Sequence, residues 1–273
     1  MQGLGKFIPT QKKIEYLNQL LLVGFDTLDF GSFVSPKAVP QMKDTRAVLG
    51  GLDLKNTTTK LLAIVANLRG AQEACAFPEI QYLGFPLSIS ETFQQRNAHQ
   101  TISQGLELVK NLLDLCGVHH KKLVLYLSMA FGNPYGDVFH LEEVAGFVDR
   151  VKNIGVEIVS LSDTIGAGGP DEVYFLVDDI KAHFPDLEMG VHLHSTPVLA
   201  REKINAAFMA GCRRFDGALK GYGGCPMASD SLVGNIPTEL ILSCLKDLGI
   251  GELIIPRAFQ EAFVLADEIF KEV

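Results

Sequence analysis

The sequence lacks tryptophan and has no stretch in which lysine and arginine gather. Its 273 residues carry a net charge of −8 at pH 7, so the basic surface by which proteins bind nucleic acids is missing. No apolar run reaches the roughly 18 residues that a membrane-spanning helix requires, and the N-terminus has no signal-peptide segment. We therefore expect a cytoplasmic protein with no nucleic-acid and no membrane partner.

Cysteine is scarce and scattered, and one common cofactor motif is missing. The five cysteines occur singly, without a C-x-x-C pair, which disfavours a disulfide framework and a structural zinc site. No G-x-G-x-x-G follows the first predicted strand, so dinucleotide binding is unsupported. The 47% of apolar and 21% of charged residues are ordinary for a globular protein with a substantial core.

Short β-rich runs alternate with amphipathic helical stretches along almost the whole chain. This alternation predicts parallel strand pairing. No linker or change of composition divides the sequence, so we expect one domain over residues 1–273. The seven predicted strands are residues 25–32, 59–66, 79–88, 122–131, 156–163, 189–195 and 213–220.

A predicted helix over residues 10–24 comes before the first strand. A (β/α)₈ TIM barrel begins with a strand, so a leading helix and seven strands predict such a barrel with its first strand missing or truncated at the N-terminus. A doubly wound sheet is the alternative, because strand number alone does not exclude it. Further helices are expected at residues 102–116, 141–155, 171–184, 197–211 and 237–249.

Polar side chains interrupt the predicted strands near their C-terminal ends. In a barrel these ends meet at one mouth, where active sites of this architecture are built, so we expect the side chains to converge. They are Asp29, Ser32, Ser128, Ser160, Asp163, His192, His194, Asp216 and Lys220.

Residues 190–195 read GVHLHS and place two histidines one residue apart. In a strand His192 and His194 share a face, because successive side chains point to opposite sides. Two neutral imidazoles at this spacing can bind one divalent cation. They could equally be hydrogen-bonded residues of a barrel mouth, since the motif is short.

A glycine-rich loop, GYGGCPMASDSLVGN over residues 221–235, follows the last predicted strand. It carries Cys225, a thiol that could exchange a proton with substrate, and Asn235, whose amide oxygen suits a divalent ion. A plain loop with a free thiol is the alternative. Asp163, in SDTIGAGGP, could likewise serve the site or simply cap a helix.

Together these motifs resemble those of 3-hydroxy-3-methylglutaryl-CoA (HMG-CoA) lyases, in the HMGL-like barrel superfamily that also holds isopropylmalate and homocitrate synthases. SFVSPKAVPQM, NLRG, SLSDTIGAGGP, HLH and GGCP…GN recur in the family's order over essentially the whole chain. SFVSPK with GGCP is specific to the lyase branch. The resemblance implies cleavage of HMG-CoA to acetyl-CoA and acetoacetate, as in leucine degradation.

The resemblance also implies which residues form the site. A divalent metal, Mg²⁺ or Mn²⁺, would be bound by His192, His194 and Asn235. Cys225 would move a proton at the product carbon, Asp163 would contact the reacting group, and Asp29, where the family commonly has glutamate, is the third catalytic candidate. The candidates for substrate binding are Gln2, Ser32 and Ser160.

In the family an Arg-Asp pair ends the first strand, shortly before a glutamine that matches Gln2. Its aspartate completes the metal site and its arginine steadies the enolate. Met1 lies just after the place where that pair would stand. The strand count and the resemblance point to the same missing element, so we expect a translation start assigned too far downstream or a shortened chain.

Three smaller departures concern the substrate range. Asp29 is one methylene shorter than the family's glutamate, and Ser195 replaces an aspartate often found after H-x-H. The loop from Cys225 to Asn235 is one residue longer than in animal forms. Two other functions stay open at this point. One is a related aldolase or Claisen-type synthase acting on another acyl-CoA or 2-oxo acid. The other is a non-catalytic metal- or CoA-binding protein. An acyl-CoA is the expected substrate, and a homodimer is compatible with this interpretation.

Overall fold

The computed structural model describes residue 1, residues 6–223 and residues 233–270. Seven strands of this part form one parallel sheet whose spatial order, β1 to β7, follows the sequence. A doubly wound sheet requires a reversal of strand order, so that alternative is excluded. The strands are β1 (Thr27–Ser32), β2 (Lys60–Ile64), β3 (Ile80–Ser88), β4 (Lys122–Ser128), β5 (Ile158–Asp163), β6 (Glu188–Leu193) and β7 (Arg214–Asp216).

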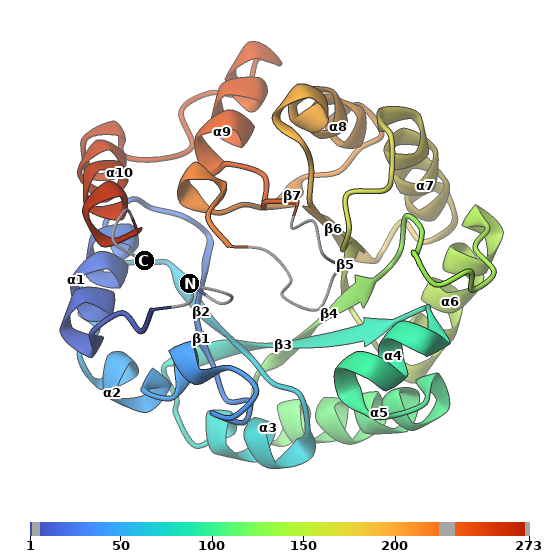
Figure 1. The fold of residues 1–273 in the computed structure, drawn as a ribbon, viewed down its shortest axis with the longest axis horizontal. Coiled ribbons are helices and arrows are strands. Elements are labelled where there is room, and N and C mark those ends of the chain that lie inside the picture. The colour runs from blue at the N-terminus through green and yellow to red at the C-terminus, as the bar shows by residue number, and fades with distance from the viewer. Residues whose placement is uncertain (2–5, 224–232, 271–273) are drawn as a thin grey trace.

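Helices cover the outer face of the sheet, and the strands curl into a half-barrel inside them (Figure 1). The predicted TIM-barrel architecture of alternating strands and helices is thus confirmed. Two short 3₁₀ turns, η1 (Pro40–Met42) and η2 (Leu219–Gly221), lie between the main elements. The helices are α1 (Thr10–Leu21), α2 (Thr45–Gly50), α3 (Leu68–Cys75), α4 (Glu91–Ala98), α5 (Ile102–Val118), α6 (Leu141–Ile154), α7 (Pro170–His183), α8 (Pro197–Met209), α9 (Thr238–Asp247) and α10 (Pro256–Phe270).

Local sequence explains where several helices begin. The side chain of Asn67 caps α3 by accepting a hydrogen bond from the backbone N–H of Gly70. A Cβ at Gly70 would lie 2.4 Å from the carbonyl oxygen of Phe33, so only glycine allows NLRG to pack against the SFVSPK segment. Thr101 and Gln104 form a reciprocal capping box at the start of α5.

Two hydrophobic clusters hold the barrel together. The larger one joins the sheet to the surrounding helices. The smaller one consists of Leu62, Tyr82, Val124 and Ile158 from β2 to β5. Tyr126 packs against this smaller cluster and also lines the central cavity, so the cluster fills the barrel interior below the C-terminal ends of the strands.

The sheet is open between its two edge strands. No strand within the described residues pairs with the free edge of β1 or of β7. A cavity of ≈ 1020 Å³ lies there, lined by both edge strands, by α1 and by α9. The described sheet has the seven strands that the sequence predicted. A complete (β/α)₈ barrel has one strand more.

Four strands end earlier than the sequence suggested, and β4 and β7 differ most. β4 stops at Ser128 because Met129 has a positive φ of 61°, which turns the chain out of the sheet. β7 covers only Arg214–Asp216, because the chain soon leaves the sheet for the η2 turn, where Lys220 has a φ of 60°.

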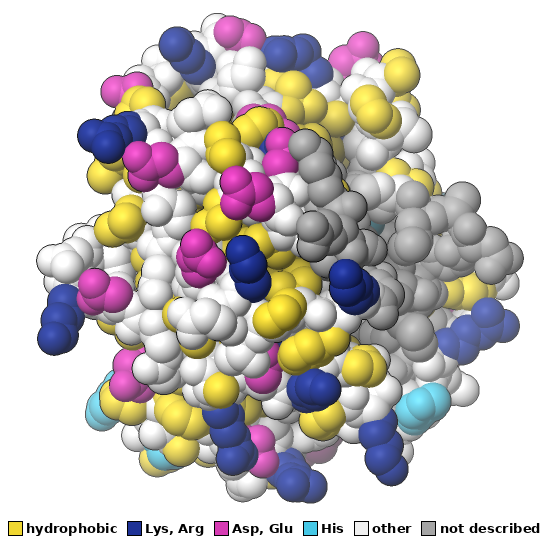
Figure 2. Space-filling view, turned by 60° about the vertical axis from the view of Figure 1, so that its left-hand side comes forward, with side chains coloured by type: hydrophobic (Ala, Val, Ile, Leu, Met, Phe, Trp, Pro, Cys, Tyr) yellow, Lys and Arg dark blue, Asp and Glu magenta, His cyan; other side chains and the backbone are white. Residues whose placement is uncertain are grey.

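The outer surface carries charges of both signs. On the side of the molecule shown in Figure 2, acidic and basic side chains are interspersed and no continuous basic patch is visible. No helix in the described part of the chain is both long and apolar enough to cross a membrane.

Candidate metal centre

The two histidines at the end of β6 bring their ring nitrogens together. The parallel register sets His192 between Ser162 of β5 and Asp216 of β7. The Nε2 atoms of His192 and His194 lie 3.3 Å apart, and both residues line the central cavity. A single cation can therefore contact both imidazoles from the cavity side.

The hydrogen bonds of His194 define which of its nitrogens is free. Nδ1 lies 3.1 Å from the backbone oxygen of Val233. A carbonyl oxygen can only accept, so Nδ1 carries the proton and Nε2 keeps its lone pair. Burial and the neighbouring His192 lower the pKa of His194 to about 4. The ring is therefore neutral at physiological pH, which is the form that binds metals.

Asn235 lies directly beside this pair. It forms an antiparallel bridge with His194, and its Nδ2 donates a 3.0 Å hydrogen bond to the backbone oxygen of Tyr222. This contact leaves Oδ1 as the amide atom available to a ligand. Across the described residues no three His, Cys, Asp or Glu side chains cluster around a metal position. Imidazole nitrogens and an amide oxygen are donor types that suit a divalent cation.

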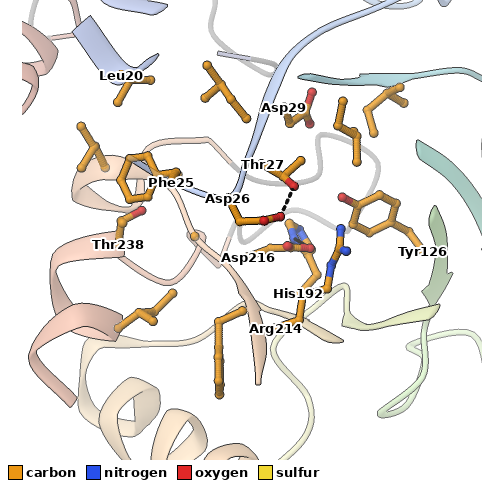
Figure 3. Close-up of a pocket in the computed structure, with 18 of the residues that line it drawn as sticks. Leu20, Phe25, Asp26, Thr27, Asp29, Tyr126, His192, Arg214, Asp216 and Thr238 are labelled. Atoms are coloured by element: carbon orange, nitrogen blue, oxygen red, sulfur yellow. Dashed lines mark hydrogen bonds and ion pairs between the residues drawn. The ribbon is translucent and has the colours of Figure 1, made fainter. Parts of the chain in front are cut away.

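Asp29 lies on β1, the edge strand on the other side of the cavity from β7, and lines the cavity (Figure 3). Its side chain is exposed, but the space that it faces is this cavity. Enclosure by protein weakens its hydration and, with a further contribution from Asp216, raises the pKa of Asp29 to about 7. A carboxyl group with this pKa can exchange a proton near neutral pH.

Asp163 does not line the cavity. Its carboxylate accepts a 2.8 Å hydrogen bond from the Nζ of Lys203, and both side chains are almost fully buried. It also accepts from the backbone N–H groups of Ala167 and Gly168. Asp163 thus holds the β5–α7 loop against α8, and burial raises its pKa despite the adjacent Lys203 cation.

Two predicted substrate-binding serines are also engaged inside the protein. Ser32 donates to the backbone oxygen of Ile64 and accepts from the N–H of Val34. Ser160 is fully buried and donates to Asp216 over 3.1 Å. Neither lines the cavity. The other two predicted residues, Gln2 and Cys225, lie outside the described residues.

Comparison of the sequence with known protein families shows which family the chain belongs to. The model of the HMGL-like family matches residues 1–260. The chain belongs to the HMGL-like family. The resemblance to HMG-CoA lyases that the sequence motifs indicated is thereby confirmed.

Relatives of this HMGL-like chain include named lyases. It is 32% identical over 258 residues to hydroxymethylglutaryl-CoA lyase YngG of Bacillus subtilis, covering 92% of this chain and 83% of that protein. It is 32% identical over 250 residues to the 3-hydroxy-3-isohexenylglutaryl-CoA/hydroxy-methylglutaryl-CoA lyase of Pseudomonas aeruginosa, covering 92% and 82%. The similarity therefore spans nearly the whole chain and not one shared motif.

Solved structures give the same picture. The HMG-CoA lyase of Brucella melitensis superposes with a TM-score of 0.91 at 28% identity, covering 99% of this chain and 94% of that one. An Acinetobacter baumannii HMG-CoA lyase in complex with coenzyme A and 3-methylmalate superposes with a TM-score of 0.89 at 29% identity, covering 98% and 87%. The half-barrel is thus the family fold over almost its full extent.

Two positively charged residues of the HMGL-like barrel, Lys203 and Arg214, were not singled out from the sequence. Lys203 occupies the buried face of α8 together with Ala200, Ile204 and Ala207. A lysine within such an apolar helical face was the available signal, because buried lysines need a partner. Arg214 stands at the beginning of β7 and lines the cavity, and nothing in its local sequence distinguishes it from a surface arginine.

The lowered pKa of His194 predicts how the stability of the metal-free protein depends on pH. Between pH 6.5 and about 4 the unfolded chain protonates this histidine while the native state does not, so stability falls as the pH drops. From pH 7 to pH 5 this group alone should remove about 2 kcal/mol. Urea unfolding at both pH values, with wild type and His194→Gln, measures it. An equal pH dependence in the two proteins would contradict the assignment.

Proposed function

We propose that this chain is a divalent-metal-dependent carbon–carbon lyase that cleaves HMG-CoA to acetyl-CoA and acetoacetate. The observation that carries the proposal is the pair of Nε2 atoms 3.3 Å apart at the cavity of an HMGL-like barrel. Membership of the family implies a divalent metal, and we propose Mg²⁺ or Mn²⁺. We further propose a single catalytic domain, a cytoplasmic location and a homodimeric assembly.

The proposed ligands are His192, His194 and the Oδ1 atom of Asn235. The hydrogen bonds on the far sides of His194 and Asn235 support this choice, because they orient the free donor atoms of both residues. A cation held by them would supply Lewis acidity toward the oxygen atoms of the substrate.

The reaction breaks the C2–C3 bond of the acyl chain. The tertiary hydroxyl at C3 loses its proton, and its electrons form the ketone of acetoacetate. The electron pair of the broken bond passes into the thioester carbonyl and gives the enolate of acetyl-CoA. A proton delivered to C2 completes acetyl-CoA, so the site needs one proton acceptor and one proton donor.

Asp29 is the proposed acceptor. Its pKa of about 7 supports this role, since a carboxylate that is too acidic would be a weak base. Cys225 is the proposed donor on the strength of the family resemblance. Asp163 is proposed to act through the loop that it holds, and Ser160 through Asp216, because both side chains are committed to these contacts. Gln2 and Ser32 remain proposed substrate-binding residues.

A product assay tests the function. The purified protein with Mg²⁺ or Mn²⁺ should release acetoacetate and acetyl-CoA from HMG-CoA in equal amounts, and EDTA should stop the release. The matched reaction offers acetyl-CoA with 2-oxo acids. Condensation there, with no acetoacetate from HMG-CoA, would replace the lyase assignment by a Claisen-type synthase.

A further inference from the structure

We propose that Asp216 is a positioning residue that keeps the proton of His192 on Nδ1 and so presents Nε2 to the cation. This inference rests on the proposed function, because it assigns a role to the support of a proposed metal ligand. Asp216 belongs to β7, the strand next to the histidine. The sequence placed it among the polar side chains expected at the barrel mouth but gave it no role.

The geometry points to Asp216 as the acceptor for a proton on Nδ1 of His192. The two residues are direct neighbours in the β6–β7 register. Oδ2 of Asp216 lies 3.6 Å from Nδ1 of His192, just beyond hydrogen-bond distance. This Nδ1 is buried and has no hydrogen-bond partner within the described residues. A small rotation of either side chain would close this distance to a hydrogen bond.

The carboxylate itself is anchored on its other side. Ser160 of β5 donates to the same Oδ2 atom over 3.1 Å. Arg214, two residues earlier on β7, lies in the same group of cavity side chains (Figure 3). Arg214 can lie across the sheet because its neighbour is Gly190, where a Cβ would be 2.8 Å from the Cγ of Arg214.

Packing alone does not choose the tautomer of His192. Its ring lies between the edge of Tyr126, at 5.8 Å between centroids, and the ring of His194, at 5.3 Å. These contacts restrict the plane of the imidazole but offer Nδ1 no acceptor. Nε2 of His194 is itself an acceptor at 3.3 Å, so without Asp216 it would draw the proton of His192 to Nε2, where it blocks a cation.

The test replaces the carboxylate by an amide of the same shape. In Asp216→Asn we expect the His192 proton to move to Nε2 and the dissociation constant for Mn²⁺ to rise about 10- to 100-fold. Imidazole ¹⁵N chemical shifts of the metal-free protein report the tautomer, and titration calorimetry with Mn²⁺ reports the affinity. The wild type should carry a proton on Nδ1 of His192.

Asp26→Asn is the matched control. Asp26 also lines the cavity, but its ion pair is with Lys60 and its side-chain hydrogen bond is with Thr27. The control removes the same charge from the same cavity and should change neither the tautomer nor the Mn²⁺ affinity by more than about twofold. A Nδ1 proton that persists in Asp216→Asn, or equal affinity losses in both variants, would overturn the inference. The spectra need no metal, so they decide the role of Asp216 even where wild type fails to bind Mn²⁺ and the proposed function falls.

Discussion

Replacing His194 by alanine should abolish tight Mn²⁺ binding and lower kcat/KM for HMG-CoA by about 10³-fold or more, because Lewis-acid stabilisation by a metal contributes several kcal/mol to a transition state. His194 is the better supported of the two imidazole ligands. Its Nδ1 is hydrogen-bonded to the backbone oxygen of Val233 and its ring is neutral, so the lone pair of Nε2 is free to bind a cation. His192→Ala should show the same loss, since the two Nε2 atoms converge on one position.

The control for these variants is the same substitution at an exposed histidine. His183 lies near the end of α7, where its side chain is 65% exposed beside Asp179. His183→Ala should retain full Mn²⁺ affinity and turnover. Calorimetry and the acetoacetate assay are run on all three variants after circular dichroism has shown that each is folded. Wild-type affinity in His194→Ala would refute its role as a ligand.

Lys203→Met should destabilise the protein by about 3–5 kcal/mol, because it leaves a buried carboxylate without its counter-ion. Lys203 is fully buried and donates to Asp163, and it also reaches the backbone oxygens of His194 and Gly166. The substitution therefore loosens the end of β6 and the β5–α7 loop together. The free energy of unfolding in urea measures the effect.

Two variants separate the buried ion pair from a general effect on α8. Adding Asp163→Asn to Lys203→Met removes the unpaired charge and should restore part of the lost stability. Arg201, on the same helix, forms an ion pair with Asp247 in which the side chains are 46% and 65% exposed. Arg201→Met should cost less than about 1 kcal/mol. A Lys203→Met protein as stable as Arg201→Met would contradict this account of the pair.

Much of the fold could be predicted because it follows from patterns in short stretches of the sequence. Alternating apolar strands and amphipathic helices give the seven parallel strands, and the period of two in GVHLHS places both imidazoles on one face. Strand lengths were less accessible. β7 pairs with β6 only from Arg214 to Asp216, an extent that depends on the arrangement of the sheet and not on the local sequence.

The site was predicted in part for the same reason. The Nε2 atoms of His192 and His194 lie 3.3 Å apart, and Asn235 forms a backbone bridge with His194. Their role as metal ligands stays a prediction. The partners of these residues were not predictable, because they come from distant segments. Lys203 meets Asp163 only when α8 packs on the end of β5, and the assignment of Asp163 and Ser160 to the interior follows from such contacts.

An anomalous difference map from crystals soaked in MnCl₂ would examine the shared cation directly. The structure predicts one manganese peak bonded to Nε2 of both His192 and His194, with Oδ1 of Asn235 as a further ligand. A peak bonded to only one imidazole, or no peak between the two rings in a well-ordered crystal, would contradict the proposed metal centre.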